Sequence, residues 1–165
     1  MVDIDPLTEL TIKLSRQNLS EDKKNIAICT CIKKTVPQAN RISLWRFEDD
    51  RQTIRCVMRH EGVPRNDVNN MVLRQAQFPA YFDTILKNEL VVASDARSHP
   101  DTTDFTESYL VPNKIYSVLD FMFHQNFKPV GLLSCEAVGR PVKWGDRDIA
   151  VMKRAAGIIS MFYPG

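Results

Sequence analysis

The sequence has little of what marks most enzyme classes. It contains only six glycines and three histidines among 165 residues. We find no glycine-rich phosphate loop, no nucleophile elbow and no paired-histidine metal motif. We therefore predict that the chain is not an enzyme, and we expect no cofactor and no metal.

Long runs of like-charged residues and long apolar runs are also absent. Lysine and arginine number 22 and aspartate and glutamate 20, a formal net charge of +2, and the basic residues are scattered rather than clustered. This argues against a nucleic-acid partner. No stretch approaches the roughly 18 apolar residues of a membrane helix, so we expect no membrane insertion. The opening MVDIDPLTEL lacks the basic start and apolar run of a secretory signal, which predicts a cytoplasmic protein.

The four cysteines are irregularly spaced, at positions 29, 31, 56 and 135. In a cytoplasmic chain this spacing favours free thiols over disulfides. Cys29 and Cys31 lie in a segment with helical periodicity, where residues two apart point to different faces. We interpret them as buried thiols rather than as half of a zinc site.

Hydrophobic periodicity divides the chain into helices and strands. Leu7, Leu10 and Leu14 follow helical spacing after Pro6, and a second helix is expected to start at Ser20 and to end before Pro37. Strands are predicted at 41–47, 54–60, 90–93, 117–125 and 129–138, with a short apolar segment at 71–73 and a hairpin turn around Asn126. Further helices are predicted after Pro79, between about 101 and 112, and from about 145 to 163.

Hairpins dominate this order, and regular alternation of strands and helices is missing. The pattern indicates an α+β domain built on an antiparallel sheet. We divide the chain into a helical extension, residues 1–19, and one domain, residues 20–165.

A set of ordered matches in this domain resembles a known family. The matching segments are Phe-Pro-Ala-Tyr-Phe at 78–82, Ala-Ser-Asp-Ala-Arg at 93–97, His99-Pro100, Ser-Val-Leu-Asp at 117–120, Val-Gly-Leu-Leu at 130–133, Glu136, Gly139-Arg140, Trp144 and Asp146. They are similar to the GAF domains of bacterial sensor proteins. The resemblance implies a GAF/PAS-like, six-stranded antiparallel sheet with the N- and C-terminal helices on one face. Short helices within residues 78–116, here called the lid, would cover the other face.

In this family, small ligands are bound beneath the lid. The resemblance and the patterning together suggest a candidate pocket lined by Phe78, Tyr81, Phe82, Asp95, His99, Phe105, Tyr109, Leu110, Ile115, Ser117, Leu119 and Phe121. The alternative is that the aromatic residues are ordinary core and that Asp95 and His99 brace a loop. Phe121 and Phe123 are bulky and would fill part of any cavity.

Two carboxylates lie within apolar strands, where an unpaired charge costs several kcal/mol. We expect Glu136 to form a salt bridge with Arg140, close to Trp144. Strict alternation along the strand places Asp120 beside His124, either in the pocket or facing solvent.

The terminal helices suggest a dimer interface. The candidates follow heptad-like spacing: Leu7, Leu10, Leu14, Ile149, Met152, Ala156, Ile159 and Tyr163. The alternative is that this face packs on the chain's own sheet.

The predicted function is a bacterial regulatory sensor domain that binds a small molecule, dimerises, or does both. Its terminal helices would pass the signal to an output domain such as a histidine kinase or a cyclic-di-nucleotide enzyme. The Asn-Lys-Phe…Asp-Glu signature of cyclic-nucleotide GAF domains is absent and the lid holds no cysteine for a bilin, so neither ligand is expected. The alternatives are a ligand-free dimerisation scaffold and, as the least favoured, a thiol-dependent methionine sulfoxide reductase.

Overall fold

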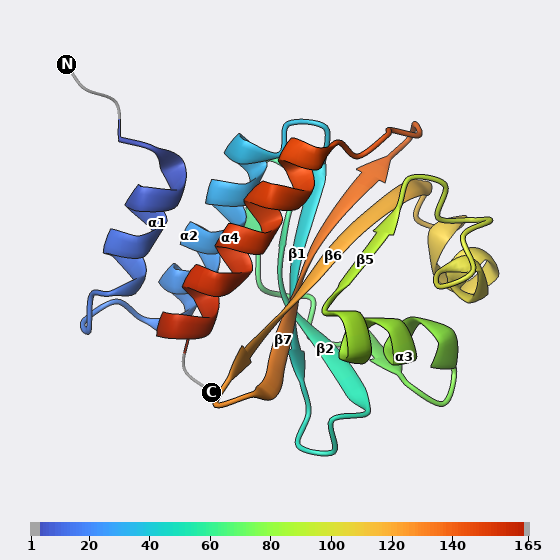
Figure 1. Cartoon of the computed structure of the whole chain (residues 1–165), viewed down its shortest axis with the longest axis horizontal. Coiled ribbons are helices and arrows are strands. Elements are labelled where there is room, and N and C mark those ends of the chain that lie inside the picture. The colour runs from blue at the N-terminus through green and yellow to red at the C-terminus, as the bar shows by residue number, and fades with distance from the viewer. Residues whose placement is uncertain (1–3, 164–165) are drawn as a thin grey trace.

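The computed structural model describes residues 4–163 and has three layers (Figure 1). One layer contains the helices α1 (Pro6–Leu14), α2 (Glu21–Thr35) and α4 (Asp146–Phe162). An antiparallel sheet forms the middle, and the lid lies against its other face. The expected α+β architecture, with terminal helices on one face, is confirmed.

The sheet runs in the order β3-β2-β1-β7-β6-β5, and β4 also pairs with β2. Its strands are β1 (Arg41–Phe47), β2 (Thr53–His60), β3 (Pro64–Arg65), β4 (Val72–Arg74), β5 (Leu90–Ala93), β6 (Ile115–Gln125) and β7 (Lys128–Val138). The five longer strands lie where the alternating pattern predicts them. The seventh strand, which was not expected, comes from the two-residue β3, a segment too short to show any period.

Local signals explain where the first two helices begin. Pro6 occupies the first turn of α1, and the Asp5 carboxylate accepts a hydrogen bond from the backbone N–H of Thr8. At the start of α2, the Ser20 hydroxyl accepts one from the N–H of Lys23. Both contacts satisfy N–H groups that the helix itself leaves unpaired. The predicted cap at Ser20 is confirmed.

The predicted dimer residues lie in the core between the helices and the sheet. Seven of the eight are buried, namely Leu7, Leu10, Leu14, Met152, Ala156, Ile159 and Tyr163, and Ile149 is partly buried against the same cluster. Their helical spacing therefore reflects packing within the chain, and these side chains offer little surface to a second copy. A dimer interface and packing on the chain's own sheet predict the same periodicity, so only the tertiary structure distinguishes them.

Phe121 and Phe123 also belong to this helix-side core. The Phe123 ring covers Gly131 on the neighbouring strand β7, where an added Cβ would lie 2.4 Å from the ring and 2.3 Å from the backbone oxygen of Trp45. The expectation that these two phenylalanines fill the ligand cavity was wrong, because they point to the opposite face of the sheet.

The lid consists of α3 (Pro79–Asn88) and the segment that follows β5. Where one short helix is predicted, the structure has a 3-10 turn, Thr103–Phe105, followed by a π-helical turn, Thr106–Leu110. In the loop before it, the Asp95 carbonyl accepts the His99 N–H, and His99 Nδ1 accepts the Asp101 N–H. Both residues thus brace the loop.

Candidate ligand-binding site

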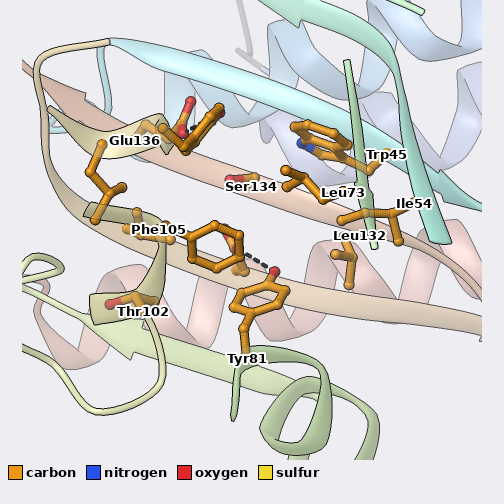
Figure 2. Close-up of a pocket in the computed structure, with 13 residues that line it drawn as sticks. Trp45, Ile54, Leu73, Tyr81, Thr102, Phe105, Leu132, Ser134 and Glu136 are labelled. Carbon is orange, nitrogen blue, oxygen red and sulfur yellow. Dashed lines mark hydrogen bonds between the residues drawn. The ribbon is translucent and has the colours of Figure 1, made fainter. Parts of the chain in front are cut away.

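A pocket lies between the lid and the sheet (Figure 2). It is lined by Trp45, Ile54, Leu73, Tyr81, Thr102, Phe105, Tyr109, Leu110, Val118, Asp120, Leu132, Ser134 and Glu136. The space between these side chains is about 380 Å³, part of it open to solvent, but the volume that the centre of a water molecule can reach is only about 30 Å³. In this conformation the pocket has room for a few water molecules.

The two ends of the pocket differ in chemistry. Figure 2 shows Trp45, Ile54, Leu73 and Leu132 grouped at one end, and Glu136 at the other, with Ser134 between them. A pocket with one apolar end and one polar end would suit a ligand that has an apolar part and a polar part.

Four of the twelve predicted site residues line this pocket: Tyr81, Phe105, Tyr109 and Leu110. The other eight lie elsewhere: Phe78, Phe82, Asp95, His99, Ile115, Ser117, Leu119 and Phe121. Phe78 supports the pocket indirectly, because its ring stacks on Phe105 with centroids 4.1 Å apart. Phe82 and Ile115 belong to the lid-side core.

Strand β6 accounts for three of the misplaced residues. Its pairing with β7 shifts between Ile115 and Ser117, which is an irregularity of the β-bulge kind. A one-residue shift moves the following side chains to the other face. Leu119 and Phe121 consequently face the helices, whereas Val118 and Asp120 line the pocket. Ser117 is a structural residue whose hydroxyl donates to the Ser94 carbonyl.

Asp120 is bound to the lid. The Tyr81 hydroxyl on α3 donates a hydrogen bond of 2.5 Å to Asp120 Oδ2, drawn dashed in Figure 2. The other oxygen, Oδ1, is buried and has no hydrogen-bond partner among the described residues. Burial raises the pKa of Asp120 to about 7, whereas the nearby Ser134 and Tyr81 hydroxyls lower it. The Ser134 hydroxyl thus interacts with the carboxyl group but makes no hydrogen bond of standard geometry to Oδ1. The expected neighbour His124 instead contacts Glu89 at 2.6 Å, because the pairing shifts again between Phe123 and His124.

Glu136 has a different partner from the predicted one. It accepts a 2.7 Å hydrogen bond from Arg41 Nε and a 2.8 Å hydrogen bond from the Tyr109 hydroxyl, and no contact with Arg140 is present among the described residues. Arg41 lies directly opposite Glu136 on strand β1, a pairing that sequence proximity could not reveal. Burial lowers the pKa of Arg41, but Glu136 and other neighbouring groups raise it by more, so the Arg41 guanidinium stays charged.

Four polar residues form a line across the lid face of the sheet. Asp120 on β6 lies opposite Ser134 on β7, Ser134 opposite Ser43 on β1, and Ser43 opposite Arg59 on β2. Directly opposite residues of an antiparallel pair share a face. We call these four residues the polar row.

Sequence reasoning missed several pocket residues. Trp45, Ile54, Leu73, Val118, Leu132 and Ser134 were not among its site candidates, and neither were Thr102 and Glu136. Asp120 was considered for the pocket only as one of two alternatives, and the structure places it there. Alternation within each strand could show which neighbouring residues share a face of the sheet with Trp45 or with Leu132. It could not indicate which face lies beneath the lid.

All four cysteines are free and buried, and burial raises the pKa of each thiol. Residues 4–163 contain no cluster of three or more His, Cys, Asp or Glu side chains that could hold a metal ion. Within the same range, no helix has the length and apolar character needed to cross a membrane.

Comparisons with known proteins give a clear result for the fold only. No family model and no curated protein matches the sequence. Among solved structures, a protein with bound biliverdin IXa in its far-red absorbing dark state is similar with a TM-score of 0.73 and 15% identity, over 94% of this chain and 96% of that one.

Two further structures are similar over most of their length. The GAF domain of an Acinetobacter phosphoenolpyruvate-protein phosphotransferase has a TM-score of 0.67 and 13% identity, covering 98% of this chain and 96% of that one. The free methionine-R-sulfoxide reductase of Neisseria meningitidis, in complex with its substrate, has a TM-score of 0.72 and 9% identity, covering 99% and 92%. At such identities a likeness shows the fold alone, and the fold of this chain is that of the GAF domains.

Proposed function

We propose that this protein is a non-catalytic regulatory sensor domain that binds a small molecule between the lid and the sheet. The observation that carries this proposal is the unpaired Oδ1 of Asp120, a buried oxygen in the wall of a pocket. A buried polar atom without a partner is costly, and proteins retain such atoms mainly at functional sites. The similarity in fold to a protein with bound biliverdin IXa and to the GAF domain of a phosphoenolpyruvate-protein phosphotransferase supports the same conclusion.

Binding requires the lid to move. The present free volume admits only water, so a metabolite would have to displace Phe105, Tyr109 or Leu73. Tyr109 and Leu110 belong to the π-helical turn, and such turns occur often at functional sites. We expect this turn to be the segment that shifts.

Strand β6 provides a route from the pocket to the terminal helices. Asp120 faces the pocket, whereas its neighbours Leu119 and Phe121 face the helix layer. Further along, the His124 N–H donates to Ser160 Oγ on α4. A shift of β6 on ligand binding would thus reach α4. In this proposal residues 20–165 form the sensor unit of a bacterial, cytoplasmic protein, and α1 is an extension that packs on it.

The partner would be an output domain, in the same chain or in another, such as a histidine kinase or a cyclic-di-nucleotide enzyme. A homodimer fits such a role. Because the heptad-like residues are buried, a dimer would have to use other residues of the helix layer.

The test is native mass spectrometry of protein purified without denaturation, paired with the mass of the denatured chain. We expect an added mass that disappears on denaturation and is weaker for Asp120→Asn. Asp104→Asn, which removes an exposed lid carboxylate, is the control and should retain the added mass. A bare chain that also takes up nothing from a small-molecule extract would contradict the proposal.

A ligand-free dimerisation scaffold is the second candidate. The small free volume favours it, because a pocket that admits only water needs no ligand. A bare chain whose native mass is that of a dimer would support this candidate.

The third candidate, a methionine sulfoxide reductase, has one structural neighbour in its favour. That chemistry needs an accessible thiolate. Here every thiol is buried with a raised pKa, which supports the non-catalytic proposal. Turnover of free methionine sulfoxide with a thiol reductant, abolished by Cys135→Ser, would overturn that view.

A further inference from the structure

Unpaired polar atoms gather on the lid face of the sheet. They are Oδ1 of Asp120, Oγ of Ser43, Nε and Nη2 of Arg59, and Nη2 of Arg41. Each is buried and lacks a hydrogen-bond partner among the described residues. Three of these residues belong to the polar row, and Arg41 lies two positions from Ser43 along β1. A single row of neighbouring positions thus collects most of the unmet hydrogen-bonding capacity of the described chain.

The unpaired groups at the two ends of the polar row differ in chemistry, because one end has a carboxyl group and the other a guanidinium. At the β6 end, Asp120 is 5% exposed, and its carboxyl group faces no neighbouring cation. At the β2 end, Arg59 has two unpaired N–H positions, and its charge acts on the Tyr109 hydroxyl of the lid. The carboxyl group at the β6 end would be paired best by a cationic hydrogen-bond donor, and the guanidinium at the β2 end by an anionic acceptor.

Arg41 adds a second unpaired hydrogen-bond donor near the β2 end of the polar row. Its side chain is 6% exposed, and Glu136 and Glu61 each contact only one of its nitrogens. Nη2 therefore remains available on the same side of the sheet as Arg59. Two guanidinium groups with free N–H positions suit a carboxylate, which accepts hydrogen bonds on both oxygens.

An apolar row runs beside the polar row. Leu132 is paired with Met122 on one side and with Trp45 on the other, and all three belong to the lid-side core. Trp45 and Leu132 line the pocket together with Leu73. A ligand bound across the polar row would place any further substituent against this apolar wall.

We propose that the pocket, once Tyr109 is displaced, binds a small zwitterion with an apolar substituent, of the apolar amino-acid class. Its ammonium group would lie on Asp120, which lines the pocket, and its carboxylate on Arg59 and Arg41, which lie beside the present pocket and are not among its lining residues. This rests on the proposed function and specifies the ligand. Neighbouring strands lie about 4.8 Å apart, so the backbones of Asp120 and Arg59, which are three spacings apart, are separated by about 14 Å. A compact zwitterion can contact both ends only when the Arg59 side chain extends along the row toward β6. It supplies both missing partners, and above pH 7, where Asp120 is ionised, it keeps the net charge of the site unchanged.

The test is isothermal titration calorimetry with matched probes. L-leucine carries both charged groups, 3-methylbutylamine only the ammonium, and 4-methylpentanoate only the carboxylate. The other apolar amino acids complete the panel. We expect one or more of the amino acids to bind at least about tenfold more tightly than either single-charge probe, because each unmet end contributes a charge-assisted hydrogen bond.

Two variants separate the ends of the site. Asp120→Asn should weaken the amino acid and the amine about tenfold or more and leave the carboxylate probe unchanged. Arg59→Gln should weaken the amino acid and the carboxylate and leave the amine unchanged. Arg55→Gln and Asp104→Asn are controls that should bind like the parent. Arg55 lies opposite Arg46 on the helix face of the sheet because the pairing of β1 and β2 shifts between Arg55 and Arg59, and Asp104 is an exposed lid residue. Circular dichroism verifies that each variant is folded.

Failure of this inference can be distinguished from failure of the proposed function. If native mass spectrometry finds a ligand that is uncharged or carries one sign of charge, or if the two variants do not affect amino-acid binding, the zwitterion assignment is overturned and the sensor function stands. If no probe binds and no ligand is found, both are overturned.

Discussion

Tyr81 on helix α3 and Asp120 on strand β6, 39 positions apart in the sequence, are joined by a 2.5 Å hydrogen bond. This contact links the lid to a strand whose other face packs on the helix layer. It uses one carboxylate oxygen and leaves the second unpaired inside the pocket. Asp120 therefore holds the lid through one oxygen and leaves the other oxygen available to a ligand.

Asp120 should make stability depend on pH. Burial raises its pKa from 3.8 to about 7, so between these values the folded chain holds a proton that the unfolded chain has released. Stability should fall as pH rises from about 4 to 7 and then level off. Asp120→Asn cannot titrate, so the stability of the parent relative to this variant should drop by on the order of 4 kcal/mol over that range.

Urea unfolding of both proteins at pH 4, 5.5 and 8 measures this difference. Asp104→Asn controls for the loss of a lid carboxylate. A difference that stays constant or grows with pH would mean that Asp120 is charged in the folded protein.

Glu136→Gln should be strongly destabilising. It removes the buried charged partner of Arg41 and leaves only the half-exposed Glu61, and breaking a buried pair costs about 3–5 kcal/mol. The matched control is Glu48→Gln, because Glu48 pairs with Arg55 at the same 2.7 Å but at the surface. That loss should cost at most about 1 kcal/mol. Equal midpoints of chemical unfolding for the two variants would contradict the importance of burial here.

Met152→Glu should unfold the chain rather than change its oligomeric state. Met152 is fully buried between α4 and the sheet, so the variant places a charge in the core at a cost of several kcal/mol. Met161→Glu lies on the same helix with its side chain 68% exposed, and it should leave stability nearly unchanged. Size-exclusion chromatography with light scattering and thermal unfolding measure both effects. A folded Met152→Glu protein of reduced molecular mass would restore the dimer interpretation.

Two glycine variants should act in opposite directions. Gly131→Ala forces a Cβ against the Trp45 carbonyl and the Phe123 ring and should destabilise by roughly 1–3 kcal/mol. Gly157→Ala lies on the exposed side of α4 with no atom within 4 Å of the new Cβ, and it should stabilise by roughly 0.5–1 kcal/mol. Thermal unfolding of both variants measures the contrast. A stable Gly131→Ala protein would show that Phe123 can move aside.

Patterns within one segment were sufficient for much of the fold. Alternation along 41–47 and 129–138 identified β1 and β7, and Ser20 identified the start of α2. The lid aromatics Tyr81, Phe105 and Tyr109 were placed correctly at the pocket. The errors occurred where a strand departs from strict alternation, as at Leu119 and Phe121 on β6. A bulge leaves no mark in the hydrophobic pattern, yet it reverses the face of every residue after it.

By itself the sequence determined the element types and the α+β class, because these follow from hydrophobic period, capping and turn residues, which act over a few positions. The placement of the aromatic segment as a lid came from the resemblance to GAF domains. Only the tertiary structure decided which partners meet across the sheet. The pairing of Arg41 with Glu136, the contact between Tyr81 and Asp120, and the polar row that ends at Arg59 all join residues far apart in the chain. Strand register creates these contacts, and register is a property of the assembled sheet rather than of any one segment.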